Sequence, residues 1–324
     1  MNKSKTLFIM ITMYGTLITM SSSNWMSMWM GLEMNMMGFI PLISSKYKSS
    51  SEAMMIYLLT QSVSSVMLMF AIMMNNITLN NMFNYLIMIS LLIKLGAAPF
   101  HMWMPEILTK MSWNSNLLLM TWQKIAPMMM MNNLNMNNKI LYLSVMMSVI
   151  VGSLGGLNQM SLRKIMGYSS INHLGWMLSL TKTKNNWMIY LIIYSLVIIS
   201  LCWMFKQYNM IHINQINNMS MSTTEKLNYT MMMLSLGGLP PFLGFLPKWM
   251  VIQTMMNNNL MLILMMMMLC SLMSLFYYMR TMTKMMLTFS TMNKWMKIQI
   301  NPSVIMLMMT MNLSLPLILI LNMY

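Results

Sequence analysis

The sequence predicts an all-α membrane protein, and three observations carry this prediction: a composition poor in charge, recurrent apolar runs, and an uneven distribution of basic residues. Hydrophobic residues make up 58% of the 324 residues, and only 7% of the residues are charged. Soluble domains carry about 25% charged residues. A chain with so little charge cannot cover a globule with a solvated surface, so a soluble fold is excluded.

Apolar runs long enough to cross a bilayer recur along nearly the whole chain and are separated by short loops rich in Asn and Ser. They predict about 11 transmembrane helices in one polytopic domain over residues 1–324, because no linker divides the chain. The expected spans are 6–22, 25–44, 53–74, 82–112, 114–131, 139–158, 163–181, 187–206, 224–257, 260–284 and 302–323.

The composition also indicates where the protein is made. The chain contains 60 methionines and no aspartate. This pattern is typical of an AT-rich genome whose code reads AUA as methionine, which is a mitochondrial property. The methionines then stand in for Ile and Leu on lipid-facing surfaces, and we expect the protein in the mitochondrial inner membrane.

The basic residues test this span assignment. With the N-terminus in the matrix, thirteen basic residues fall on the matrix side: Lys3, Lys5, Lys46, Lys48, Lys110, Arg163, Lys164, Lys206, Lys226, Arg280, Lys284, Lys294 and Lys297. The opposite side receives Lys139, Lys182 and Lys184. Such a bias agrees with the positive-inside rule and places the C-terminus in the intermembrane space. The net charge of +15 is therefore topological, and no nucleic-acid partner is expected.

Two of the spans are unusually long and contain prolines. Span 82–112 includes KLGAAPFHMWMPE, and span 224–257 includes GGLPPFLGFLPKW. Proline removes a backbone donor, so we expect helix breaks at Pro99, Pro240 and Pro241, of the kind that line polar cavities in transporters.

The two broken segments share the pattern Pro-Phe-x4-Pro followed by a charged residue, which begins at Pro99 in the first and at Pro241 in the second. Each would be the fourth helix of a five-helix unit, over 6–131 and 139–284, with the helix 302–323 left over. An odd number of helices inverts the second unit, so an inverted repeat with two discontinuous helices is expected. A chance match of a short pattern is the alternative.

Charged side chains at membrane depth are the candidate functional residues. Lys94, Lys124, Lys248 and Glu33 lie inside spans, where a charge costs about 2.5–3.5 kcal/mol on insertion scales. Lysines balanced between burial and a nearby carboxylate can change protonation when the partner moves, as a proton relay requires.

Two histidines add titratable groups near these charges. His101 lies in the first break and His173 lies in the middle of its span, and imidazole titrates near neutral pH. The bland alternatives stay open: the lysines snorkel to the interface, Glu33 makes a structural hydrogen bond, and the histidines are satisfied core residues.

Motifs for other chemistry are missing from the sequence. Gly155–Gly156 lacks the context of a dinucleotide-binding loop, and Cys202 and Cys270 lie apart in apolar stretches. Since aspartate does not occur and no cluster of metal ligands is present, we expect no cofactor or metal on this chain.

Several long blocks resemble the antiporter-like membrane subunits of NADH–ubiquinone oxidoreductase, respiratory complex I, in their mitochondrial arthropod form. The blocks are WMGLEMNMMGFIPLIS, LLIKLGAAPFHMWMPE, MTWQKIAP, GGLNQMSLRKIMGYSSINHLGWM and LSLGGLPPFLGFLPKW. The resemblance implies a fourteen-helix fold that lacks its first three helices in animals. It also implies that Glu33 and Lys94 form a buried pair, and that Lys124 and Lys248 continue a proton path.

The same resemblance implies that NADH, FMN, iron–sulfur clusters and ubiquinone are bound by other subunits. It implies as partners the neighbouring antiporter-like subunits, the small subunits beside them, and membrane lipids such as cardiolipin. Two other functions remain open at this point: an independent cation/proton antiporter, and a structural subunit that transmits conformational change.

Overall fold

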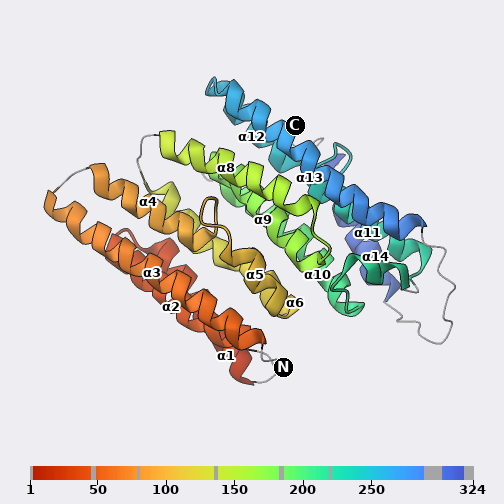
Figure 1. The fold of residues 1–324 in the computed structure, drawn as a ribbon, viewed down its shortest axis with the longest axis horizontal. Helices are drawn as coiled ribbons and strands as arrows, with labels where there is room; N and C mark the ends of the chain where they lie inside the picture. Colours follow the sequence, from red (N-terminus) through yellow and green to blue (C-terminus); the bar gives the residue numbers. More distant parts are fainter. Residues whose placement is uncertain are drawn as a thin grey trace. The chain divides into compact units, whose positions relative to one another are not determined.

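Helices dominate the structure because a backbone in lipid must satisfy its own hydrogen bonds. The computed structural model describes residues 3–44, 49–78, 81–134, 138–181, 186–218, 221–287 and 301–316, and within these ranges it contains helices and no β-strand. The chain forms two compact units, Met1–Ser148 and Val149–Tyr324. The predicted all-α class is confirmed (Figure 1).

The first unit consists of helices that follow the predicted spans closely. They are α1 (Lys3–Ser21), α2 (Trp25–Ile43), α3 (Ser49–Thr78), α4 (Asn81–Leu95), α5 (Trp103–Lys110), α6 (Trp113–Met120), the 3-10 turn η1 (Trp122–Lys124) and α7 (Ile125–Asn132). Helix α8 (Asn138–Leu157) contains the boundary between the units.

Small residues let α1 and α2 approach closely. A Cβ added to Gly15 would lie 2.7 Å from the backbone nitrogen of Asn35, and one added to Gly31 would lie 2.5 Å from Thr19 Cγ2. Membrane helices associate through such close backbone contacts, because lipid provides no hydrophobic drive between them. This contact fixes the position of α2, the helix that carries Glu33.

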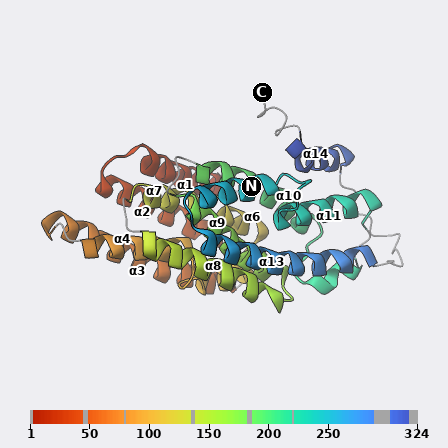
Figure 2. The ribbon, with the colours of Figure 1, turned by 90° about the horizontal axis from the view of Figure 1, so that it is seen from above.

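The second unit contains the remaining helices. They are α9 (Leu162–Ser179), α10 (Asn186–Gln207), the 3-10 turn η2 (Ile213–Asn218), α11 (Thr223–Gly237), α12 (Phe245–Asn257), α13 (Met261–Leu287) and α14 (Pro302–Asn312). Helix α11 packs against α10, α13 and α14, and Figure 2 shows α14 beside α11. The last part of the expected span 302–323 lies outside the described residues.

Both long spans are interrupted where the prolines stand, and the two interruptions are built alike. Helices α4 and α11 are both 15 residues long, and each ends four positions before the first proline of the shared sequence pattern. Gly96 ends the first with φ +69° and Gly238 ends the second with φ +74°. The backbone nitrogen of Ala97 donates to Leu92 O, as that of Leu239 donates to Leu234 O, which is the hydrogen bond of a Schellman cap.

The sequence did not predict a third interruption, within the expected span 114–131. There the chain leaves α6 at Met120, passes through η1, and enters α7 at Ile125. Pro127 has no N–H to donate to the carbonyl four residues earlier, that of Gln123, so a continuous α-helix would lack a hydrogen bond at this turn. The expectation of one unbroken helix was wrong, and Lys124 lies in the interruption.

Four described segments are both long and apolar enough to cross a membrane. They are Ser49–Asn75, Lys139–Leu157, Asn186–Gln207 and Met261–Leu287, and shorter apolar helices occur at Met82–Leu95 and Pro302–Asn312. The protein is therefore a multi-pass membrane protein of helical type.

Candidate functional site

A carboxylate and an ammonium group meet in the first unit. Glu33 lies on α2 and Lys94 lies in the last turn of α4, with 3.9 Å between Glu33 Oε1 and Lys94 Nζ. The side chain of Lys94 is 3% exposed and that of Glu33 is 20% exposed. A cation in the last turn of a helix also interacts favourably with the helix dipole. The two groups form an ion pair that is longer than a hydrogen bond.

The break after α4 leaves carbonyls without helical partners, and side chains supply the missing donors. Trp103 Nε1 donates to Ile93 O over 3.2 Å, and Gln61 Nε2 donates to Lys94 O over 3.4 Å. At membrane depth such carbonyls require partners from the protein. Trp103 and Gln61 therefore hold the main chain of Lys94 in place at the end of its helix.

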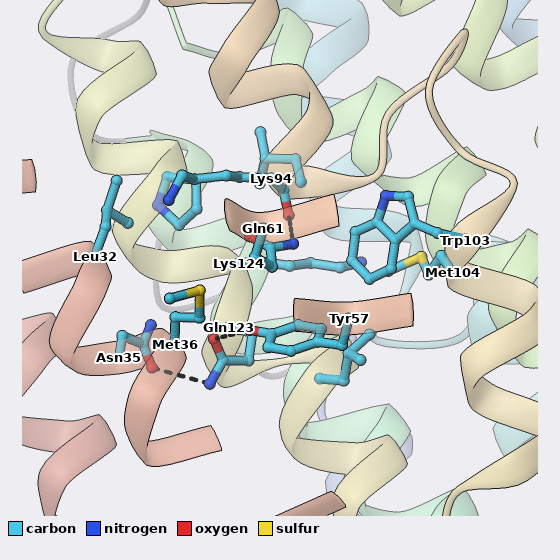
Figure 3. A pocket seen from close by; sticks show the side chains of 13 residues that line it. Leu32, Asn35, Met36, Tyr57, Gln61, Lys94, Trp103, Met104, Gln123 and Lys124 are labelled. Atoms are coloured by element: carbon cyan, nitrogen blue, oxygen red, sulfur yellow. Dashed lines mark hydrogen bonds between the residues drawn. The ribbon is translucent and has the colours of Figure 1, made fainter. Parts of the chain in front are cut away.

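Lys124 lines the same cavity as Lys94. This cavity encloses about 20 Å³ of space for water, which is enough for roughly one molecule. Lys124 is 2% exposed and lies on η1. Figure 3 shows its side chain running between Gln61 and Tyr57, and the side chains of Lys94 and Lys124 extending in opposite directions.

A hydrogen-bonded chain of neutral groups ties the turn of Lys124 to the other helices. Gln123 Nε2 donates to Asn35 Oδ1 over 2.9 Å, and the Tyr57 hydroxyl donates to Gln123 Oε1 over 3.4 Å (Figure 3). Sequence analysis missed Asn35, Tyr57, Gln61 and Gln123. Their signal was a polar side chain inside an apolar span, which at membrane depth indicates a partner or a function.

The second unit holds Lys248 in the first turn of α12. Its Nζ donates to Gly237 O over 2.7 Å, and the ammonium group lies 5.5 Å from the ring centroid of Trp176. The lysine thus satisfies a carbonyl that the second break frees, and it gains a cation–π contact. Lys248 is buried.

The two predicted histidines differ in their surroundings. His173 on α9 is buried, with 2.8 Å between its Nδ1 and the Tyr190 hydroxyl, and its ring centroid lies 4.9 Å from that of Tyr194. His101 lies in the first break with its Nδ1 3.2 Å from Pro99 O, and it does not line the cavity of Lys94 and Lys124.

The chemistry available to this arrangement is acid–base chemistry. Within the described ranges no group of three His, Cys, Asp or Glu residues could hold a metal ion, and Cys202 and Cys270 are free and buried. What remains is a set of buried groups that bind and release protons, two of them beside interrupted helices.

Comparison with known proteins identifies the family. The family described as NADH:quinone oxidoreductase/Mrp antiporter, TM, matches residues 22–274. The NADH-ubiquinone oxidoreductase chain 2 of Anopheles gambiae is 43% identical over 304 residues, which is 90% of this chain and 89% of that protein. The protein of the same name from Locusta migratoria is 40% identical, over 94% of this chain and 92% of that protein.

The chain belongs to the NADH-ubiquinone oxidoreductase chain 2 family.

The fold of this chain 2 family member also occurs in solved membrane complexes. A chain of respiratory complex I from Thermus thermophilus superposes with a TM-score of 0.82 at 22% identity, over 90% of this chain and 74% of that chain. A chain of the Mrp complex from Dietzia superposes with a TM-score of 0.77 at 14% identity, over 87% of this chain and 59% of that one. The resemblance seen in the sequence is confirmed.

The pair of amides at the Lys124 turn leads to a stability prediction. Gln123→Leu is expected to destabilise the protein by about 1–3 kcal/mol, because it leaves the buried Asn35 Oδ1 without its donor. Adding Asn35→Leu to that variant should cost less than the sum of the two single changes, since the orphaned partner is then removed as well.

The measurement is the midpoint of thermal inactivation of the purified complex for both single variants and the double variant. Strict additivity of the two shifts would show that the two amides do not support each other.

Proposed function

We propose that this chain is a membrane-arm subunit of the proton-pumping NADH:ubiquinone oxidoreductase. In this proposal it carries part of a proton path through Glu33, Lys94, Lys124 and Lys248, with His173 as an intermediate group and His101 in a lesser role. The observation that carries the proposal is the Glu33–Lys94 pair at an interrupted helix, with Lys124 lining the same cavity. Family membership supplies the enzyme to which the subunit belongs.

The mechanism follows from the electrostatics of a buried ion pair. A buried ammonium group keeps its proton while a carboxylate stands beside it, and it releases the proton more readily when the carboxylate withdraws. Glu33 and Lys94 lie on different helices, and the helix of Lys94 ends at a break. A small movement of α2 relative to the break therefore changes the protonation of Lys94, and Lys124 lies across the shared cavity as a proton acceptor.

The proposed topology is a single domain of about eleven spans over residues 1–324, built as an inverted repeat with discontinuous fourth helices. Support comes from the equal lengths of α4 and α11, their matching positions relative to the two proline patterns, and the glycine caps Gly96 and Gly238. The lysine distribution supports a matrix N-terminus and an intermembrane-space C-terminus in the mitochondrial inner membrane.

The proposal assigns the redox chemistry to other subunits. NADH, FMN, iron–sulfur clusters and ubiquinone are bound elsewhere in the complex, and this chain contributes the response of its buried charges. Its partners in this proposal are neighbouring antiporter-like subunits, the small subunits beside them, and membrane lipids including cardiolipin, with no nucleic acid.

The decisive experiment neutralises the ion pair in three ways. Lys94→Met and Glu33→Gln are each expected to leave the complex assembled and to lower proton pumping coupled to NADH oxidation in proteoliposomes. In the double variant Glu33→Gln with Lys94→Met, no buried charge is left uncompensated, so a purely structural pair predicts recovery of pumping. The proton-path proposal predicts that pumping stays low in the double variant, and normal pumping there would refute it.

An independent cation/proton antiporter is the second candidate, favoured by the likeness to a chain of the Mrp complex. The two functions differ in what the isolated chain does. An antiporter exchanges a cation for protons when reconstituted alone in liposomes, whereas a complex I subunit purifies with many other chains and shows no exchange by itself.

A further inference from the structure

A series of buried hydroxyl groups in the second unit has no part in the lysine path. Five tyrosines lie there with almost no exposed surface: Tyr190, Tyr194, Tyr229, Tyr277 and Tyr278. They come from helices α10, α11 and α13, around α9. Buried hydroxyls need hydrogen-bond partners, and packing alone would favour phenylalanine at such positions. So many tyrosines in one membrane interior therefore indicate a function for the hydroxyl groups.

The series begins at a carboxylate that sequence analysis did not single out. Glu225 in the first turn of α11 is only 4% exposed. Its Oε2 accepts a hydrogen bond from the Ser222 backbone nitrogen over 2.7 Å, and its own nitrogen donates to Ser222 Oγ, which together form a capping box. The second feature of Glu225 is its contact with the hydroxyl of Tyr208, just beyond the end of α10. Burial and this carboxylate raise the pKa of Tyr208.

The middle of the series lies further into the unit. The Tyr229 hydroxyl lies beside Thr281, and the Tyr278 hydroxyl lies beside Tyr277 and Ser169. Among the described residues, none of these three tyrosine hydroxyls makes a well-formed hydrogen bond. Each therefore keeps the capacity to donate and to accept, and rotation of the C–O–H group can switch its partner.

The series ends at His173. The Tyr194 hydroxyl lies beside Ser170, whose Oγ donates to Gly167 O and is therefore an acceptor toward the tyrosine. Tyr194 and Tyr190 both contact the His173 ring. His173 lies one turn of α9 before Trp176, which the ammonium group of Lys248 contacts.

The depth of these groups increases from Tyr229 to His173. Counted along the helices, Tyr229 lies about two turns after the start of α11, and Tyr278 lies between about two and three turns before the end of α13. His173 lies about three turns after the start of α9. Arg280 and Lys284 mark the end of α13 as the matrix side under the positive-inside rule. The series therefore leads from the matrix side toward the middle of the membrane.

We propose that Glu225 and the hydroxyls of Tyr229, Tyr278 and Tyr194 form a proton-uptake path from the matrix end of the second unit to His173 and Lys248. In each step a hydroxyl accepts a proton at its oxygen and gives its own proton to the next acceptor, so no net charge remains on the tyrosines. Water completes the links that the side chains leave loose. This path rests on the proposed function, because it supplies the lysines assigned there.

The test uses Glu225→Gln, because glutamine keeps the capping box while losing the titratable carboxylate. Tyr229→Phe and Tyr278→Phe remove single hydroxyls at nearly constant volume. Tyr14→Phe is the matched control, since Tyr14 is 63% exposed on α1. The assembled complex is reconstituted in proteoliposomes, and the rate of NADH-driven proton pumping is measured with and without formate as a small diffusible acid.

The expected result is a pumping rate reduced roughly tenfold in Glu225→Gln and in both tyrosine variants, with an unchanged amount of complex and no effect of Tyr14→Phe. Formate should partly restore Glu225→Gln, which a role in helix capping alone does not predict. Normal pumping in Glu225→Gln overturns the path, as does a loss of assembled complex in place of a loss of pumping. If Lys94→Met remains defective in the same assay, the proposed function stands and only this path fails.

Discussion

Replacing Lys124 by methionine is expected to abolish most proton pumping by the assembled complex while leaving its thermal stability unchanged or higher. Lys124 is 2% exposed and lies on the turn between α6 and α7, in the cavity that it shares with Lys94. Burying an ammonium group is costly, and a methionine of similar length removes that cost while it fills the same space. Loss of function with no loss of stability is therefore the signature of a functional charge.

The measurement pairs proton pumping in proteoliposomes with the midpoint of thermal inactivation. Lys110→Met is the matched control. Lys110 forms an ion pair of 2.8 Å with Glu52, whose side chain is 66% exposed, and exposed pairs contribute about 0–1 kcal/mol. We expect that variant to pump normally. A Lys124→Met complex that pumps like the Lys110→Met complex would remove Lys124 from the path.

Replacing Gly244 by alanine is expected to be the most damaging small substitution in the second unit. A Cβ at this position would lie 1.7 Å from Ser235 O and 2.6 Å from Ser235 C. Both atoms are backbone atoms in the last turn of α11, so no side-chain rotation relieves the overlap. The two backbone segments at the break must separate, at a cost of about 3 kcal/mol or more. We expect little assembled complex to accumulate.

Gly237→Ala provides the matched control, because it lies in the same segment and has the opposite expectation. A Cβ there meets only Leu275, at 3.5 Å, and Tyr278, at 3.9 Å, in ordinary contacts. Alanine is favoured over glycine inside a helix by about 0.5–1 kcal/mol, so this variant should assemble normally. The amount of complex on native gels and its thermal midpoint measure both variants. Equal accumulation of the two would show that the break tolerates a Cβ at Gly244.

The two predictions differ because different physical terms dominate the two positions. Lys124 carries an electrostatic cost that the protein retains, which points to selection for function. Gly244 is constrained by the close approach of two backbone segments, which is needed to turn the chain between α11 and α12. The Lys248 ammonium group bonds to the carbonyl of Gly237 in this same turn, so damage at Gly244 would also displace Lys248.

The sequence alone determined the features that depend on local chemistry. Low charge and recurrent apolar runs predicted a helical membrane protein, because a bilayer allows few other backbones. Proline and glycine in the segments after Lys94 and before Lys248 predicted interrupted helices, since a missing N–H acts on its own turn. Helix α4 ends at Leu95 and helix α11 ends at Gly237, at those segments.

Only the tertiary structure decided which of these residues meet. Glu33 and Lys94 lie on different helices, and their separation of 3.9 Å depends on the packing of α2 against its neighbours. The Asn35–Gln123 bond joins residues 88 positions apart, and Glu225 became a candidate only through its burial beside Tyr208. A single sequence records the composition of each helix. It does not record which faces of distant helices are in contact, because that is set by the packing of the whole unit.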